Sequence, residues 1–220
     1  MSQKTSFYTR VIMRLLEYEL ESAQEFCEVA HRLFTKRLKR FEAHYAAEKN
    51  VTDDVDAAVD QLEVLREHIR MSAQYGLVMV FASWERFLHD MYERTRFIST
   101  IPQLRDAEFA VDKNWLRTEE YLRYFKQLGM NMPSPPFAWI ELEALRVFRN
   151  AIAHQSGRVT EQNIAGLKKY ENERGEPYKL GDTLNVNAEF VIRNIETVRN
   201  TSRLFVQVYL ERLVTLGIEV

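Results

Sequence analysis

The sequence predicts an all-α fold, a helical bundle that begins with two long antiparallel helices. Its 220 residues include only seven glycines and five prolines, so residues that break helices are rare. Apolar positions recur at intervals of three and four residues along most of the chain, which is the period of an amphipathic helix. Together with a content of 46% hydrophobic and 28% charged residues, these patterns indicate one helical domain spanning residues 1–220.

The first helix is expected over about residues 6–49. Its apolar positions lie three and four residues apart, at Leu16, Leu20, Ala23, Cys27, Ala30, Phe34, Leu38, Phe41 and Tyr45. A break at 50–54 follows, where Thr52 or Asp53 can cap a second long helix. Residues 75–88 of this second helix are apolar nearly all round, which predicts that they lie at the centre of the core.

Shorter helices are expected in the second half of the chain. Residues 112–128 are rich in Trp, Tyr and Phe and predict a short helix, and the prolines within 129–136 then predict a turn. A helix over 137–154 follows. Residues 160–170 indicate one more short helix.

The chain is expected to end with a small β-hairpin and a long helix. Two short strand-like runs flank Gly181 and Asp182, and we predict the hairpin over 177–186. Asn187 then has the residue type and position of an N-cap. The helix that follows is expected to bury Phe190, Ile192, Ile195, Val198, Leu204, Phe205, Val208 and Leu213.

Composition excludes several classes of function. A single cysteine, Cys27, rules out a disulfide framework within one chain, and its apolar neighbours predict a buried residue rather than a nucleophile. No apolar run approaches the roughly 18 residues that a membrane span needs, and no signal peptide is recognised, so we expect a cytoplasmic protein without membrane contact. There is no glycine-rich phosphate loop, and neither Ser156 nor Thr160 has the neighbours of a hydrolase triad. No cofactor is expected.

The helix over 137–154 carries the sharpest functional signal. Its apolar stripe is formed by Leu142, Leu145, Phe148 and Ile152. The adjoining polar side carries Arg146, Arg149, Asn150 and His154, of which Asn150 and His154 are one helical turn apart. The window 144–158 contains three arginines and no acidic residue, so it predicts a small cationic island in a chain of net charge −2.

Arginine and histidine at this spacing suit RNA cleavage without a metal. A base must take the proton of the ribose 2′-hydroxyl, and His154 suits this role because the pKa of an imidazole lies near neutrality. A cation must stabilise the charge that develops on the phosphate, and the planar guanidinium of Arg149 matches phosphate oxygens. Asn150 would orient these groups by hydrogen bonding. The structural alternative is that His154 interacts with carbonyls at the helix end while Arg149 forms a surface ion pair.

The run Arg149-Asn150-Ala151-Ile152-Ala153-His154 within a helical chain resembles the HEPN superfamily. Members of that superfamily carry an Arg, a polar residue, a short spacer and a His, and many are metal-independent endoribonucleases of toxin–antitoxin and anti-phage systems. The resemblance covers residues 62–216 in architecture. The first helix (1–50) and the excursion 155–187 lie outside the minimal core.

The resemblance also implies partners. It implies RNA as substrate, a homodimer in which two motifs share a cleft, and an antitoxin or defence-system partner. One branch has a Tyr two residues after the His, where this chain has Ser156. Silencing by nucleotide transfer onto that tyrosine is therefore not implied.

Glu85 is the acidic residue that most needs a partner. It lies in an otherwise apolar run, and a buried carboxylate is costly unless it is paired. Some HEPN families place an acid near the Arg–His pair, so Glu85 could anchor Arg149 or orient His154. The alternatives are an ion pair with another arginine or a contact with His89 one turn away. We do not expect Glu85 and His89 to bind a metal, because no cluster of further ligands accompanies them.

The remaining basic residues give a weaker signal for RNA contact. Lys36, Arg37 and Arg40 belong to the densest basic run, which usually forms a solvated helix face, and Arg158 follows the motif. Two other functions stay open from the sequence. One is a catalytically silent helical module for dimerisation or for binding RNA or protein. The other is a regulatory helical protein unrelated to RNA, which a salt bridge that buries Arg149 would favour.

Overall fold

The computed structural model describes residues 3–48, 55–96, 118–171 and 175–218, and they form a helical bundle. The helices are α1 (Gln3–Glu48), α2 (Val55–Arg96), α4 (Thr118–Gln127), α5 (Trp139–Gln155), α6 (Ile164–Leu167) and α7 (Ala188–Thr215). The predicted all-α class and the two long antiparallel helices at the start are confirmed. The expected caps Thr52 and Asp53 lie outside the described residues.

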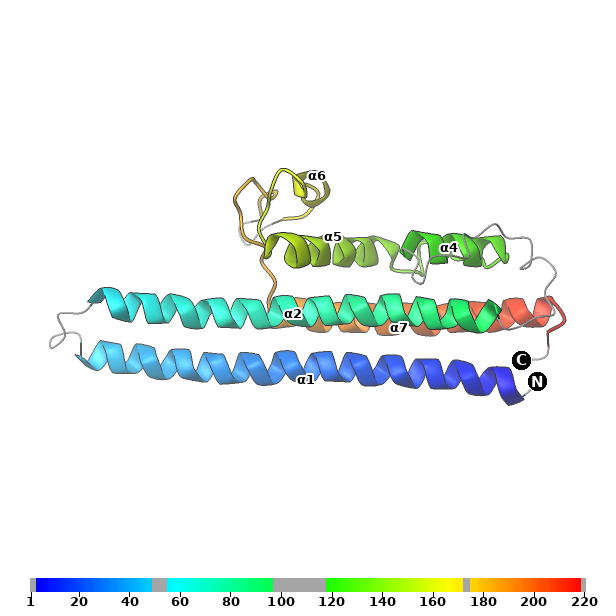
Figure 1. Cartoon of the computed structure of the whole chain (residues 1–220), viewed down its shortest axis with the longest axis horizontal. Helices are drawn as coiled ribbons and strands as arrows, with labels where there is room; N and C mark the ends of the chain where they lie inside the picture. The colour runs from blue at the N-terminus through cyan, green and yellow to red at the C-terminus, as the bar shows by residue number, and fades with distance from the viewer. Residues whose placement is uncertain (1–2, 49–54, 97–117, 172–174, 219–220) are drawn as a thin grey trace.

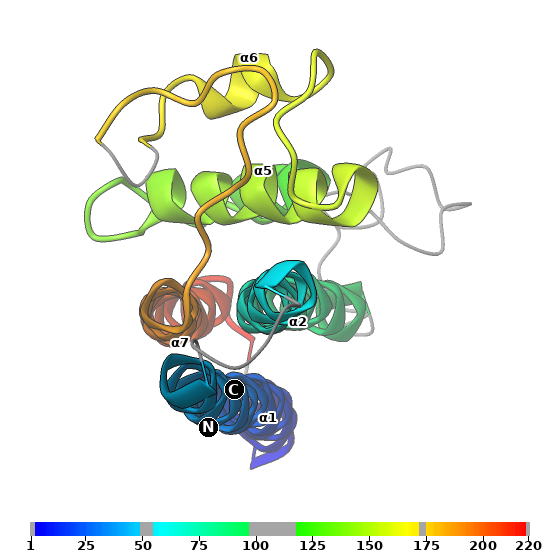
Figure 2. The same ribbon diagram turned by 90° about the vertical axis from the view of Figure 1, so that its left-hand side faces the viewer.

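The helices are arranged in three levels. Figure 2 shows α2 and α7 side by side, with α1 on one side of this pair and α5 on the other. α4 continues the level of α5 along the bundle (Figure 1). Because α2 contacts helices of both outer levels, its side chains form the centre of the core, with Leu77, Trp84 and Leu88 fully buried.

The second half of α1 is less buried than its apolar periodicity predicts. The stripe is buried at Leu16, Leu20, Ala23 and Cys27, but Phe34 and Phe41 are only half-buried. Figure 1 shows α1 and α2 extending past the beginning of α7, and only the first turns of α7 reach this part of α1. An apolar face needs contacts on two sides to be fully buried.

The expectation that residues 75–88 are buried all round is also wrong in part. Tyr75 is 54% exposed and Met79 is 37% exposed, and with Ala82 and Arg86 they form one exposed line along α2. The opposite faces of the same segment pack against α1, α5 and α7.

The predicted hairpin over 177–186 is wrong. The turn at Gly181 and Asp182 exists, closed by a 3.1 Å hydrogen bond from Asp182 N to Lys179 O. Its two sides do not pair with each other as strands, because this segment pairs with the chain just after α5. Val159 N donates to Asp182 O and Leu184 N donates to Gly157 O, both at 2.8 Å. These contacts supply the hydrogen bonds that an isolated two-stranded hairpin would otherwise have to supply alone.

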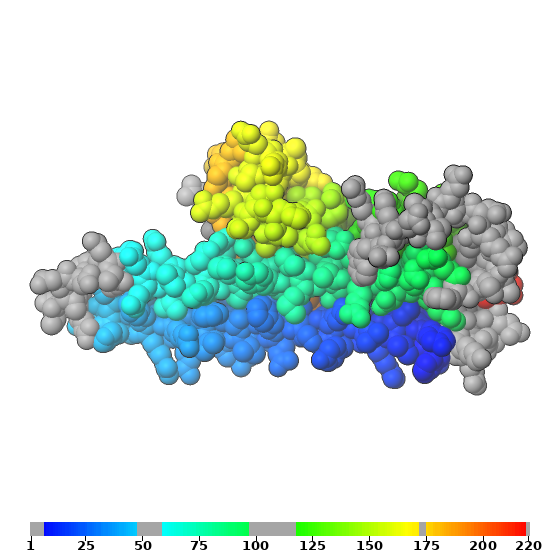
Figure 3. Space-filling model, viewed as in Figure 1, coloured from blue at the N-terminus to red at the C-terminus, as the bar shows by residue number. Residues whose placement is uncertain are grey.

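The segment between α5 and α7 forms a lobe above the long helices (Figure 3). α6 in this lobe has only four residues, fewer than the expected 160–170. α7 begins as predicted, since Asn187 Oδ1 accepts a 2.8 Å hydrogen bond from Phe190 N.

Candidate functional site

α5 presents the motif as its wheel predicts. Leu142, Leu145, Phe148 and Ile152 are all buried. Arg146, Arg149 and Asn150 are half-buried beside this stripe, and His154 is exposed in the last turn. The four polar residues therefore lie between core and solvent, where side chains can contact both.

The motif lines a cleft between α2, α4 and α5. The cleft has a volume of about 820 Å³, and it is lined by Phe81, Glu85, Thr118, Glu119, Glu120, Arg123, Arg146, Arg149, Asn150 and His154. Its lining is mostly polar, and a cleft of this size is large enough for a small ligand. Arg149, Asn150 and His154, which the sequence singled out, thus contact one common space.

Arg149 is held by three neighbours. Its Nη1 donates to Asn150 Oδ1 at 2.9 Å, and its Nη2 donates to Glu85 Oε2 at 3.3 Å. The guanidinium carbon lies 5.3 Å from the centre of the Phe81 ring, within the range of a cation–π contact. Its Nε is buried without a hydrogen-bond partner. The guanidinium is therefore fixed in position and keeps donor capacity.

Glu85 contacts Arg149, which is the first of the partners considered for it. The side chain of Glu85 is 18% exposed and that of Arg149 is 28% exposed. Burial raises the pKa of the Glu85 carboxyl, and the charge of Arg149 opposes this rise. Because the desolvation of Glu85 outweighs its attraction to Arg149, this pair alone stabilises the fold little.

Arg146 is committed to the acids of its own neighbourhood. Its Nε and Nη2 donate to the two carboxylate oxygens of Glu143, each at 2.8 Å, and Glu119 lies 3.5 Å from its Nε. The bonds from Arg146 hold the pKa of Glu143 below its usual range. Arg146 is thus less able than Arg149 to bind an added anion.

The end of α5 fixes the position of His154. Ser156 and Gly157 adopt positive φ angles of 53° and 72°, and Gly157 N donates to Ala151 O at 3.1 Å. Such a left-handed ending closes the last helical turn. The chain then leaves the helix directly after the motif, so His154 stays exposed at the rim of the cleft.

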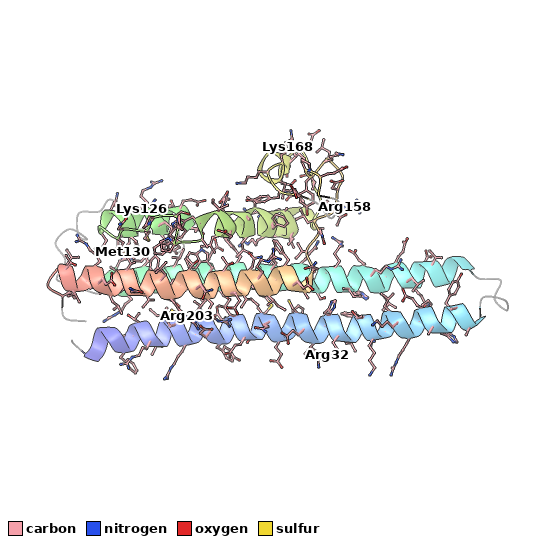
Figure 4. The ribbon with its side chains drawn as sticks, turned by 180° about the vertical axis from the view of Figure 1, so that it is seen from behind. Arg32, Lys126, Met130, Arg158, Lys168 and Arg203 are labelled. Atoms are coloured by element: carbon pink, nitrogen blue, oxygen red, sulfur yellow. The ribbon has the colours of Figure 1, made fainter. Side chains whose placement is uncertain are left out.

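The other predicted RNA-contacting residues do not line this cleft. Arg158 is exposed after the end of α5. A hydrogen bond from Arg70 lowers the pKa of Glu67 on α2, and the charge of Arg158 adds a smaller effect in the same direction. Lys36, Arg37 and Arg40 are exposed on α1. Figure 2 shows α1 across the α2–α7 pair from α5, and Figure 4 labels Arg32 on α1 and Arg158 beside the end of α5.

The sequence did not predict the part of the cleft that α4 contributes. Arg123, Glu119 and Glu120 come from α4, and nothing in the spacing of the motif connects them with Arg149. They also correct the expected cationic island, because the window 144–158 meets acids from α2 and α4 and the cleft carries both signs of charge. The only sequence signal for these residues was that the helix predicted over 112–128 is strongly aromatic and carries charged residues on its other face.

No group of three or more potential metal ligands occurs within the described ranges, and no helix in them is long and apolar enough to cross a membrane. Comparisons with protein-family models, with curated proteins and with solved structures found no match.

Proposed function

We propose that this chain is a metal-independent endoribonuclease that uses Arg149 and His154. The observation that carries the proposal is their placement on one open cleft, with the guanidinium of Arg149 held by Glu85, Asn150 and Phe81 and with His154 exposed at the rim. A fixed cation beside an accessible imidazole is the smallest set of groups that this reaction needs.

The proposed reaction is an internal transesterification. His154 takes the proton of the 2′-hydroxyl, and the 2′-oxygen attacks the adjacent phosphorus. The bond from phosphorus to the 5′-oxygen breaks, and that oxygen takes up a proton as it leaves. The products are a 2′,3′-cyclic phosphate and a free 5′-hydroxyl, and DNA is not a substrate because it lacks the nucleophile.

Arg149 would stabilise the charge on the phosphate, with Glu85 and Asn150 as positioning residues. The pair with Glu85 supports this role, because a phosphate can compete with Glu85 for Arg149 Nη2, which donates to Glu85 over a long 3.3 Å. Preorganised donors of this kind typically contribute about 100- to 1000-fold to a rate.

A second copy of the chain would complete the site. One imidazole can accept a proton, but nothing else in the motif is a clear acid for the leaving 5′-oxygen. We infer a homodimer in which two copies of Arg149 and His154 line one groove, so that one His154 acts as base and the other as acid. Closed two-fold dimers are the commonest soluble oligomers.

An apolar stripe on α1 is the face that we propose for this dimer. It consists of residues that are between 36% and 69% exposed, namely Val11, Leu15, Tyr18, Phe26, Val29 and Leu33. Their positions are symmetric about Ser22, so two antiparallel copies would place apolar residues opposite one another. Isolated exposed apolar residues are common, but a row of six along one helix supports the proposal of an interface.

The position of the stripe along the bundle is compatible with a groove that two copies of the chain share. Glu85 of α2 contacts Arg149, and the next residue, Arg86, contacts Glu19 of α1 at 2.9 Å. Glu19 and Arg149 are therefore at one level, and Ser22 is three residues or about 4.5 Å further along α1. A two-fold axis beside Ser22, directed from α1 toward α5, would bring the two clefts together at one edge.

The same pairing has an electrostatic cost that can be measured. The exposed Glu21 and Glu25 of both copies would lie near the axis and repel each other. We therefore expect the dimer to tighten as salt rises and to dissociate in Leu15→Glu. Leu180→Glu, at another exposed leucine, is the control that should leave the dimer intact. A monomeric wild type that still cuts RNA would refute the shared site.

The resemblance supports a role as a toxin or anti-phage effector acting on RNA in the cytoplasm, with an antitoxin or another defence component as partner. A second candidate function is a catalytically silent helical module for dimerisation or binding. The Arg149–Glu85 ion pair favours this second candidate, because the pair gives Arg149 a structural role without any substrate.

A cleavage assay separates the two candidates. The purified chain is incubated with single-stranded RNA and with DNA of the same sequence, in the presence of EDTA. We expect the RNA alone to be cut and its ends to be cyclic phosphates. Arg149→Ala and His154→Ala should lose at least about 100-fold in rate while keeping the helical circular dichroism spectrum.

His31→Ala is the matched control, since His31 is an exposed histidine on α1 away from the cleft. Its rate should equal that of the wild type. Activity that disappears in EDTA, or that survives in His154→Ala, would contradict the proposed mechanism. Absence of any cleavage would support the silent module.

A further inference from the structure

A second, more apolar pocket adjoins the cleft. It has a volume of about 300 Å³ and lies between α2, α4 and α5. Its apolar walls are Phe81, Trp84, Leu122, Trp139 and Leu142. Lys126, which is labelled on α4 in Figure 4, stands at its rim with three other charged residues, and two of these, Arg146 and Glu143, are paired with each other.

Trp84, one of the residues that line this pocket, has an unused hydrogen-bond donor. The side chain is fully buried, and its Nε1 has no hydrogen-bond partner. A buried donor without a partner is uncommon, because leaving it unpaired costs free energy. The other indole of the pocket differs, since Trp139 Nε1 donates to Met132 O at 3.0 Å.

The pocket and the cleft share walls. Phe81, Thr118, Glu119 and Arg146 line both spaces. The Arg149 guanidinium lies over the ring of Phe81, 5.3 Å from its centre. A ligand with a charged part at Arg149 and a flat apolar part in the pocket could therefore occupy both spaces at once.

We propose that this pocket binds one unpaired nucleobase of the RNA whose phosphate lies at Arg149. This inference rests on the proposed function for the identity of the substrate. Every base has an apolar face that stacks on aromatic rings and an edge with acceptors for the Trp84 N–H. A base in a duplex is stacked and paired and cannot enter, so the pocket selects single-stranded RNA.

The pocket can be tested without relying on catalysis. The His154→Ala chain is labelled with ¹⁵N and titrated with nucleoside 3′-monophosphates, with ribose 5-phosphate and with inorganic phosphate. The indole N–H signal of Trp84, assigned with Trp84→Phe, should move with the nucleotides and stay fixed with both phosphates that lack a base. Equal movement with inorganic phosphate, or no movement with any nucleotide, would overturn the proposal.

A blocking variant provides the second measurement. Leu122→Trp adds bulk at a half-buried position of the pocket, and Leu210→Trp adds the same bulk at a half-buried leucine of α7 beside α1. Loss of a stacked base weakens binding by about 5- to 150-fold. We expect the affinity for nucleoside 3′-monophosphates to fall by this factor in Leu122→Trp and to stay unchanged in Leu210→Trp. Equal affinities in the two variants would contradict the base pocket.

The two proposals fail in different ways. If the wild type does not cut RNA but Trp84 responds to nucleotides, the chain binds single-stranded RNA without cleaving it and the pocket stands. If the wild type cuts RNA but neither Trp84 nor the Leu122→Trp affinity responds, the nuclease stands and the base pocket is wrong.

Discussion

Gly157 offers the sharpest test of how the motif helix ends. Its φ is +72°, and a Cβ added there would lie 2.3 Å from Nε2 of Gln74, a side chain buried in α2. An L-residue in the left-handed region costs about 1–2 kcal/mol. Overpacking against a buried side chain costs about 1–3 kcal/mol more. We therefore expect Gly157→Ala to lower the free energy of unfolding by about 2–5 kcal/mol.

The control separates strain from contact. Gly175 has nearly the same φ, +71°, with no atom within 4 Å of an added Cβ, so Gly175→Ala should show the backbone cost alone. Urea denaturation followed by circular dichroism measures both variants. Gln74→Ala in the Gly157→Ala background should recover the difference between them, because Gln74 Nε2 has no hydrogen bond to lose. If Gly157→Ala is no less stable than Gly175→Ala, then Gly157 does not pack closely against Gln74 of α2.

Three further predictions follow from buried groups. A Cβ on Gly76 would lie 1.9 Å from Cys27 Sγ, so Gly76→Ala should lose about 1–3 kcal/mol in urea denaturation and recover with Cys27→Ala; no recovery would contradict the α1–α2 contact. Because burial raises the pKa of Glu85, its contribution to stability is full below about pH 4 and is lost as pH rises through the folded pKa. The melting temperature of the wild type should therefore fall as pH rises through the folded pKa of Glu85, and that of Glu85→Gln should not. Identical pH profiles in the two proteins would refute this prediction. Burial raises the pKa of Cys27 to about 11, so a thiol reagent at neutral pH should label it only after unfolding.

The sequence predicted those features that local spacing determines. The stripe of α5, the burial of Cys27 and the cap at Asn187 all follow from residue types at fixed intervals. The acid in an apolar run was also informative, because burial obliges Glu85 to find a partner, and that partner is Arg149.

The predictions that were wrong concern features that depend on contacts between distant segments. Phe34 and Phe41 have the spacing of core residues, but only the first turns of α7 reach this part of α1, so both side chains stay half-buried. Residues 177–186 have the composition of a hairpin, yet they pair with residues 157–159. Arg123 reaches the cleft only because α4 packs on α2 in line with α5, which no local pattern encodes.

The central claim is that His154 activates a ribose 2′-hydroxyl beside Arg149. The most direct measurement first maps the bond that the wild type cuts in an RNA oligonucleotide, with EDTA present. It then compares cleavage rates for that RNA and for the same RNA with a 2′-O-methyl group at the mapped nucleotide. We expect a cyclic phosphate end on the unmodified RNA, no cut at the methylated nucleotide, and no cut of either RNA by His154→Ala. Cleavage of the methylated bond would contradict it.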